Sequence, residues 1–139
     1  MLLPQSLPQP KEPDIELSET VYRQIEEKRI IAKKGREYVI FRFEQVAYFY
    51  IENGLSYLVD RSNHAKYIMA KPLREIEEYV KSKYFFRVNK KYLININAVV
   101  KFKPLKKGKL QLVVNPDPNE IIIISQLKAH LFKEWVLQD

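Results

Sequence analysis

The stretch Phe85–Asn97, FFRVNKKYLININ, decides how this part of the chain folds. Counting from its second residue, every second residue is apolar except Lys90, which is the pattern of a β-strand with one buried face. A continuous strand would point the Lys90 ammonium group into the core, where an unpaired charge is very costly. We therefore predict a break that displays Asn89, Lys90 and Lys91 on a loop between rigid strands, a common position for binding residues.

Positive charge is concentrated around this stretch. No acidic residue occurs between Glu78 and Asp117, although the whole chain holds 24 Lys and Arg, 17 Asp and Glu, and a net charge of +7. The segment Lys81–Lys109 carries these basic residues: Lys81, Lys83, Arg87, Lys90, Lys91, Lys101, Lys103, Lys106, Lys107 and Lys109. Such a local field suits a polyanion, because bound cations release the counterions condensed on phosphates. A solvated basic face that only aids solubility is the alternative.

Composition limits the classes of function. A chain of 139 residues with 46% hydrophobic content can fill the core of one domain. It contains no cysteine, which excludes disulfides and thiolate metal sites and fits a cytoplasmic location. No apolar run is long enough for a membrane span, and the start does not resemble a secretion signal. We expect no membrane partner.

Catalytic and metal-binding patterns are missing from the sequence. His64 and His130 have no third ligand at metal spacing. The chain has no nucleophile elbow and no Gly-rich phosphate loop, and nothing indicates a shielded pair of carboxylates. We therefore expect a protein that is not an enzyme and has no cofactor.

The chain divides into two parts. Residues 1–28 begin with a Pro-rich stretch typical of a linker or tail, followed by an ambiguous lead-in, and residues 29–139 form the expected domain. Besides Phe85–Asn97, short strands are predicted at Arg29–Lys33, Tyr38–Arg42, Gln45–Ile51, Ser56–Asp60, Lys66–Ala70, Ala98–Lys103, Leu110–Val114 and Ile121–Ile124. The last of these is a continuous apolar run, as expected for a strand covered on both faces.

Two helices interrupt this meander. Pro72 begins an amphipathic helix over Pro72–Ser82, with Leu73, Ile76, Tyr79 and Val80 as its apolar stripe. Ser125 can cap a final helix in which Leu127, Leu131 and Trp135 recur at every fourth position and should face the core. Nine or ten strands and two helices indicate a mainly β fold.

Four segments carry a family resemblance. They are Phe43–Tyr50 (FEQVAYFY), Leu73–Glu77 (LREIE), Phe85–Asn95 (FFRVNKKYLIN), and Ile124-Ser125 together with Phe132–Trp135 (FKEW). Together they resemble a LytTR DNA-binding domain, of the kind found at the C-terminus of bacterial response regulators. The resemblance covers about residues 29–136. It implies an elongated β-sandwich of about ten short, mostly antiparallel strands, with one internal amphipathic helix and a C-terminal helix.

The resemblance also implies how such a domain meets DNA. Loops, rather than a recognition helix, enter successive major grooves on one side of the duplex. The DNA-binding residues that the resemblance implies are Asn53, Ser56, Asn89, Lys90, Gln126 and Lys128. Arg87 and Lys91, two basic residues of the same acid-free segment, are also expected to bind DNA. Many members have histidine where this chain has Asn89, and arginine where it has Gln126. Because Gln suits adenine and Arg suits guanine, the target sequence does not transfer.

Several of these residues also have structural interpretations. Asn53 precedes Gly54 and can simply form a turn, Ser125 can simply cap a helix, and Asn95 can tie a strand end. Only for Lys90 does the alternation of apolar and polar residues in Phe85–Asn97 offer no structural explanation.

The function that these patterns predict is sequence-specific DNA binding by a transcriptional regulator. The expected partner is double-stranded promoter or operator DNA, bound by the output domain of a two-component response regulator. A receiver domain outside this chain and a dimer on DNA are further expected partners. The alternative is a basic module that docks anionic lipid or an acidic protein.

Overall fold

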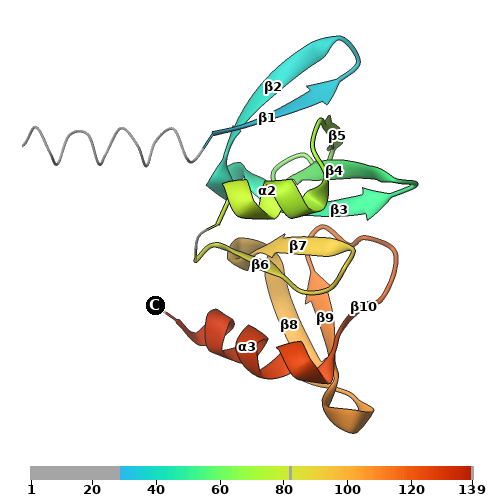
Figure 1. The fold of residues 1–139 in the computed structure, drawn as a ribbon, viewed down its shortest axis with the longest axis vertical. Coiled ribbons are helices and arrows are strands. Elements are labelled where there is room, and N and C mark those ends of the chain that lie inside the picture. Colours follow the sequence, from blue (N-terminus) through green and yellow to red (C-terminus); the bar gives the residue numbers. More distant parts are fainter. Residues whose placement is uncertain (1–28, 82, 139) are drawn as a thin grey trace, which may run out of the picture.

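The protein is a mainly β structure, seen in a computed structural model that describes residues 29–81 and 83–138. The predicted linker within residues 1–28 lies outside the described residues. The described part has ten strands in two antiparallel sheets, which confirms the predicted fold class. The molecule is elongated, with the β1–β2 hairpin at one end and the C-terminal helix at the other (Figure 1).

The larger sheet has seven strands in the order β2-β1-β5-β4-β3-β7-β6. Their bounds are β1 (Arg29–Lys34), β2 (Glu37–Arg42), β3 (Val46–Glu52), β4 (Leu55–Asp60), β5 (Lys66–Met69), β6 (Phe85–Arg87) and β7 (Tyr92–Asn95). The smaller sheet has the order β10-β9-β8, with β8 (Val99–Pro104), β9 (Leu110–Val114) and β10 (Ile122–Ile124). The helices are α2 (Leu73–Tyr79) and α3 (Gln126–Leu137), with short 3-10 turns at η3 (Phe43–Gln45), η4 (Ile96–Ala98) and η5 (Lys106–Gly108).

Two hydrophobic cores share the central strands. One contains buried side chains of β1, β2 and α2, and the other contains those of β9, β10 and α3. Consecutive residues of β3 and β7 alternate between them: Tyr48 and Ile94 belong to the second core, whereas Phe49 and Leu93 belong to the first. Because successive side chains of a strand point to opposite faces, β3 and β7 join both cores.

The predicted break in Phe85–Asn97 is confirmed, and it is a chain reversal. β6 ends at Arg87, β7 begins at Tyr92, and the two strands pair antiparallel. Val88 and Tyr92 close the hairpin with a backbone hydrogen bond of 3.1 Å. Lys90 therefore lies in a hairpin loop, and its side chain is exposed instead of pointing into the core.

Asn95 is a buried structural residue at the end of β7. It is 1% exposed, and its Nδ2 donates to the carbonyl oxygens of Phe43 and Val46 at 3.0 and 2.9 Å. Its Oδ1 accepts from the backbone N–H of Asn97 at 2.9 Å. Asn95 thus ties β7 to the start of β3 and begins η4, as its structural interpretation suggested.

The internal helix is shorter than predicted. Pro72 precedes it, and Leu73, Ile76 and Val80 are buried as expected. Tyr79 is 54% exposed, so it lies at the margin of the stripe, where its hydroxyl donates to the carbonyl oxygen of Arg29 at 2.8 Å.

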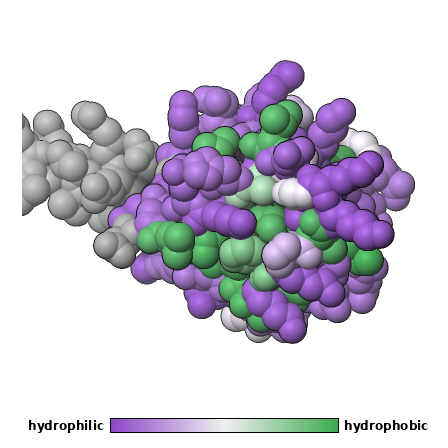
Figure 2. Space-filling model, turned by 90° about the horizontal axis from the view of Figure 1, so that it is seen from below, coloured by the Kyte–Doolittle hydropathy of each residue, from purple (hydrophilic) through white to green (hydrophobic). Residues whose placement is uncertain are grey.

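The prediction of which residues of the last helix face the core was wrong in part. Trp135 is buried as expected, but Leu127 and Leu131 are 88% and 53% exposed. Ala129 and Phe132 are buried instead, since α3 lies on the core along this face. Viewed from the α3 end, hydrophobic side chains show among the hydrophilic ones on the surface (Figure 2).

The apolar run Ile121–Ile124 is also not covered on both faces. Ile122 and Ile124 are buried, but Ile121 is 67% exposed and Ile123 is half-buried. β10 is an edge strand of the three-stranded sheet, and only one face of that sheet meets the core. Burial therefore alternates along this run, although all four residues are isoleucine.

Candidate nucleic-acid interface

The loop between β6 and β7 is shaped by Asn89. The side-chain Oδ1 of Asn89 accepts hydrogen bonds from the backbone N–H groups of Lys91 and Tyr92 at 2.8 and 2.9 Å. Its Nδ2 donates to the carbonyl oxygen of Ile123 at 3.1 Å, which links the loop to β10. Through these three hydrogen bonds the Asn89 side chain fixes the conformation of the loop, as Asn side chains often do in turns.

Arg87 holds the same loop from the other side. Its guanidinium group donates from Nε to the carbonyl oxygen of Asn89 at 2.9 Å and from Nη2 to that of Lys90 at 2.7 Å. Its Nη1 donates to the Glu77 carboxylate of α2 at 3.0 Å, and the Arg87 side chain is only 17% exposed. Three of the five N–H donors of Arg87 are used within the protein, where they fix the loop, and its contact with DNA stays a prediction.

Three segments expected to meet DNA are joined through this loop. The backbone N–H of Ile51, at the end of β3, donates to the carbonyl oxygen of Lys91 at 3.1 Å. The Nζ of Lys128, in the first turn of α3, donates to the carbonyl oxygen of Arg87 at 2.8 Å. The β3–β4 turn, the β6–β7 loop and the start of α3 follow one another along one side of the molecule (Figure 1). Lys128 therefore connects two of these segments instead of presenting its ammonium group freely.

Lys90 differs from its neighbours. Its side chain is exposed, and within residues 29–81 and 83–138 its ammonium group has no hydrogen bond or ion pair. Its carbonyl oxygen is held by Arg87. The backbone of Lys90 is thus fixed while its charged end is available to a ligand.

Lys91 has an acidic partner from a distant loop. Its Nζ lies 2.6 Å from the Glu120 carboxylate, and the Tyr92 hydroxyl donates to the same carboxylate. The hydrogen bond with Lys91, followed by that with Tyr92, lowers the pKa of Glu120. Burial, followed by the hydrogen bond with the Glu120 carboxylate, raises the pKa of Tyr92. The lowered pKa keeps the Glu120 carboxylate ionised at neutral pH, and its ion pair with Lys91 joins the β6–β7 loop to the loop after β9.

The β3–β4 turn presents Asn53 but not Ser56. Asn53 and Gly54 have φ values of 53° and 78°, which is the left-handed pair expected for a two-residue hairpin turn, and Asn53 is exposed. Ser56 is 6% exposed and is paired with β3 on one side and β5 on the other. Its burial is at odds with the expected DNA contact.

Gln126 is exposed at the start of α3, beside η5. A Cβ atom on Gly108 would lie 2.9 Å from Cγ of Gln126, and Gly108 has a φ of 75°, so glycine allows both the turn and the close approach. Lys106 and Lys107 in the same turn are exposed. Ser125 occupies the position before the helix, but its side chain makes no capping hydrogen bond there.

Two acidic residues at this site were not predicted from the sequence. Glu77 comes from α2 and Glu120 from the loop after β9, and they pair with Arg87 and Lys91. No local pattern marks either residue, since each is remote in sequence from its partner. The acid-free segment is consequently less cationic in space than its sequence indicates.

The described residues contain no group of three His, Cys, Asp or Glu side chains that could hold a metal ion. None of the helices in residues 29–81 and 83–138 is long and apolar enough to cross a membrane. The amide of Asn89, the guanidinium group of Arg87 and the ammonium group of Lys90 supply the polar groups of this loop surface.

Comparison with known proteins identifies a family and a similar fold. A sequence model of the LytTr DNA-binding domain matches residues 36–137. A solved structure from Bacillus cereus, described as the LytTr DNA-binding domain of a methyl-accepting/DNA response regulator, has a similar fold with a TM-score of 0.67. The two share 17% sequence identity, and the match covers 80% of this chain and 98% of the Bacillus cereus chain. Among curated proteins, none matches this chain significantly.

Proposed function

Because this chain belongs to the LytTr DNA-binding domain family, we propose that it binds double-stranded DNA in a sequence-specific manner through the edge formed by the β3–β4 turn, the β6–β7 loop and the start of α3. In this role it regulates transcription as the output domain of a response regulator, with a receiver domain outside this chain. The loops enter the major groove, and two copies bind one operator.

The observation that carries the proposal is the contrast between Lys90 and the residues around it. Arg87 and Asn89 use their side chains to fix the loop, and Lys91 is paired with Glu120. Lys90 projects from this rigid support with no partner in the described part of the chain. A rigid backbone lowers the entropy that binding must remove, and an ammonium group can donate to the O6 and N7 acceptors of guanine.

The other exposed polar residues of the edge have supporting roles. Gln126 can pair with the N6 and N7 edge of adenine, and Asn53 can donate and accept at the turn. Lys106 and Lys107 lie beside Gln126 in η5 and are suited to phosphates, which position a protein but carry no sequence information directly. Ser56, being buried, has no part in this proposal.

The test begins with DNA targets selected from a randomised duplex library by the full chain. Binding of Lys90→Ala is then measured on the selected duplex and on a scrambled one at a single salt concentration. We expect the variant to lose about 5- to 150-fold on the selected duplex, corresponding to about 1–3 kcal/mol of discrimination, and little on the scrambled duplex. Arg36→Ala, an exposed cation in the turn between β1 and β2 at the far end of the molecule, is the matched control.

Each outcome decides a separate part of the proposal. Equal losses on both duplexes would make Lys90 a phosphate contact and assign base reading to Gln126 or Asn53. A selection that enriches no sequence would contradict specific DNA binding. Binding to anionic vesicles without binding to duplex would instead support the lipid-docking alternative.

A further inference from the structure

A hydrophobic groove lies at the end of the molecule that carries the β1–β2 hairpin. It has a volume of about 760 Å³ between β1, β2, β5 and α2, and its apolar lining includes Ile31, Ile40, Ile68 and Met69. Ile31 and Ile40 are 59% and 64% exposed, although they pair with each other in the sheet. A contiguous apolar surface of this kind usually marks an interaction site.

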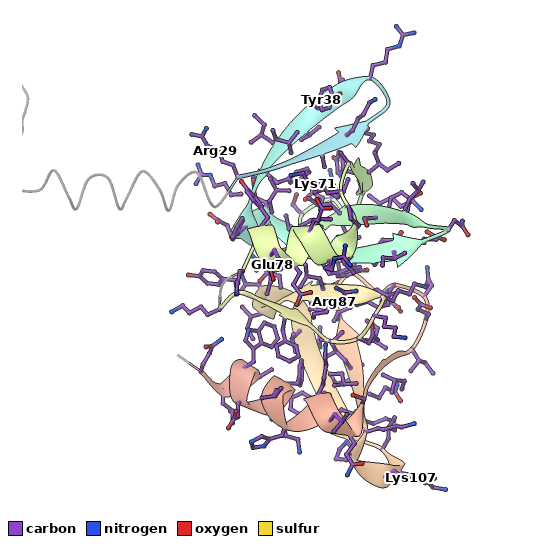
Figure 3. The ribbon with its side chains drawn as sticks, viewed as in Figure 1. Arg29, Tyr38, Lys71, Glu78, Arg87 and Lys107 are labelled. Atoms are coloured by element: carbon purple, nitrogen blue, oxygen red, sulfur yellow. The ribbon has the colours of Figure 1, made fainter. Side chains whose placement is uncertain are left out.

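The rim of this groove is basic. Arg29, Lys33 and Lys71 line it, and no acidic residue within residues 29–81 and 83–138 does so. Arg29, Lys71 and Tyr38 all lie at this end of the molecule, far from Lys107 at the other end (Figure 3). The groove therefore suits an occupant that combines apolar side chains with negative charge.

The segment Asp14–Lys28 has this composition. Leu17, Val21 and Ile25 recur at every fourth position, and the segment holds five acidic and two basic residues. It ends at the residue before Arg29, which itself lines the groove. Apolar residues at this spacing share one face when a segment is helical, so they can enter a groove together.

We propose that the groove is the docking site for Asp14–Lys28 of the same chain. The apolar positions Leu17, Val21 and Ile25 fill it, and the acidic residues face its basic rim. Direct attachment at Arg29 makes this an intramolecular contact, with an effective concentration on the order of millimolar. A second copy is less suited as occupant, because each copy carries a net charge of +7 and the groove adds no negative charge. The docked segment would connect any preceding domain rigidly to the β1–β2 end of the sheet, opposite the end that carries η5.

The chain contains no cysteine, so a single spin label can be placed by substitution. Arg23→Cys in the full chain is labelled with a nitroxide, because position 23 faces away from Leu17, Val21 and Ile25 when the segment is helical. The broadening of backbone amide signals is then measured by NMR. We expect Ile40 and Ile68 in the groove to lose most of their signal, and Arg42, which faces Arg29 across the β1–β2 pair but does not line the groove, to lose less. Val113 in the smaller sheet should be unaffected.

Two further measurements complete the test. Adding Leu17→Ser and Ile25→Ser to the labelled chain keeps the label in place and should abolish the difference between Ile40 and Arg42. Mixing labelled chain with isotope-enriched unlabelled chain should produce no broadening in the groove. Equal broadening at Ile40 and Arg42 before those substitutions, or a difference that survives them, would overturn docking of the segment. Broadening in the mixture would assign the groove to a second copy.

Discussion

Replacing Arg87 by Met should show how much of the interface depends on one guanidinium group. Met keeps most of the aliphatic stem but removes the donors to the carbonyl oxygens of Asn89 and Lys90 and to the Glu77 carboxylate, at 2.7–3.0 Å. A hydrogen bond to a charged group contributes about 1.5–3 kcal/mol to stability. The sum for three such bonds exceeds the loss of stability that a single substitution usually causes. Because the loop is at the surface, water can replace part of this loss. We expect the free energy of unfolding to fall by about 2–4 kcal/mol.

The two measurements are urea unfolding, followed by the fluorescence of the one tryptophan, Trp135, and DNA affinity on a selected duplex. Arg87→Met should lower both stability and affinity, because the loop that supports Lys90 loses its anchor. Lys90→Met is the matched control: its side chain has no partner in the described residues, so stability should change by less than about 0.5 kcal/mol while affinity falls.

Arg87→Lys separates charge from geometry. A lysine keeps the positive charge opposite Glu77 but cannot reproduce the planar fork that reaches two carbonyl oxygens and a carboxylate. Most of the stability loss of Arg87→Met should therefore remain. If Arg87→Met unfolds at the same urea concentration as the parent and binds DNA equally well, the loop does not depend on Arg87 and our account of the site is refuted.

Two other predictions concern the C-terminal helix and the acidic partner of Lys91. Trp135→Ala should destabilise the protein by about 3–5 kcal/mol, because Trp135 is buried and its Nε1 donates to the carbonyl oxygen of Lys83 at 2.7 Å. Leu127→Ala, at an exposed position of the same helix, should leave the urea midpoint nearly unchanged. Similar midpoints for both variants would contradict the packing of α3. The lowered pKa of Glu120 means that its ion pair stabilises the fold above the ordinary value of 4.5, and this stabilisation is lost as the pH falls through the lowered pKa. The stability advantage of the parent over Glu120→Gln should thus be present at neutral pH and disappear in acid, and an advantage that does not change with pH would count against the pair.

Local sequence patterns were sufficient for most of the secondary structure. Asn53-Gly54 marks a hairpin whose left-handed backbone the structure contains, and Pro72 marks the start of α2. Lys90 marked a break in the strand, because a charge cannot occupy a buried strand position without a partner, and the structure shows that this break is the reversal between β6 and β7. The family resemblance added the two-sheet architecture and the other two segments of the interface, the β3–β4 turn and the start of α3, which no local pattern marks as DNA-binding.

Part of the site lay beyond sequence reasoning, because it depends on residues that are distant in the chain. Arg87 and Lys91 looked like free cations in an acid-free segment until folding brought Glu77 and Glu120 beside them. Ser56 looked available after a turn, but in the folded protein it is 6% exposed within a strand that pairs on both sides. What the sequence by itself determined were the turns, the strand alternation and the exposure of Lys90, since each follows from the backbone and solvation of a few adjacent residues. Only the tertiary structure decided that α3 buries Phe132 in place of Leu131, and which cations remain for DNA, because both depend on the surfaces and charges that other elements place opposite them.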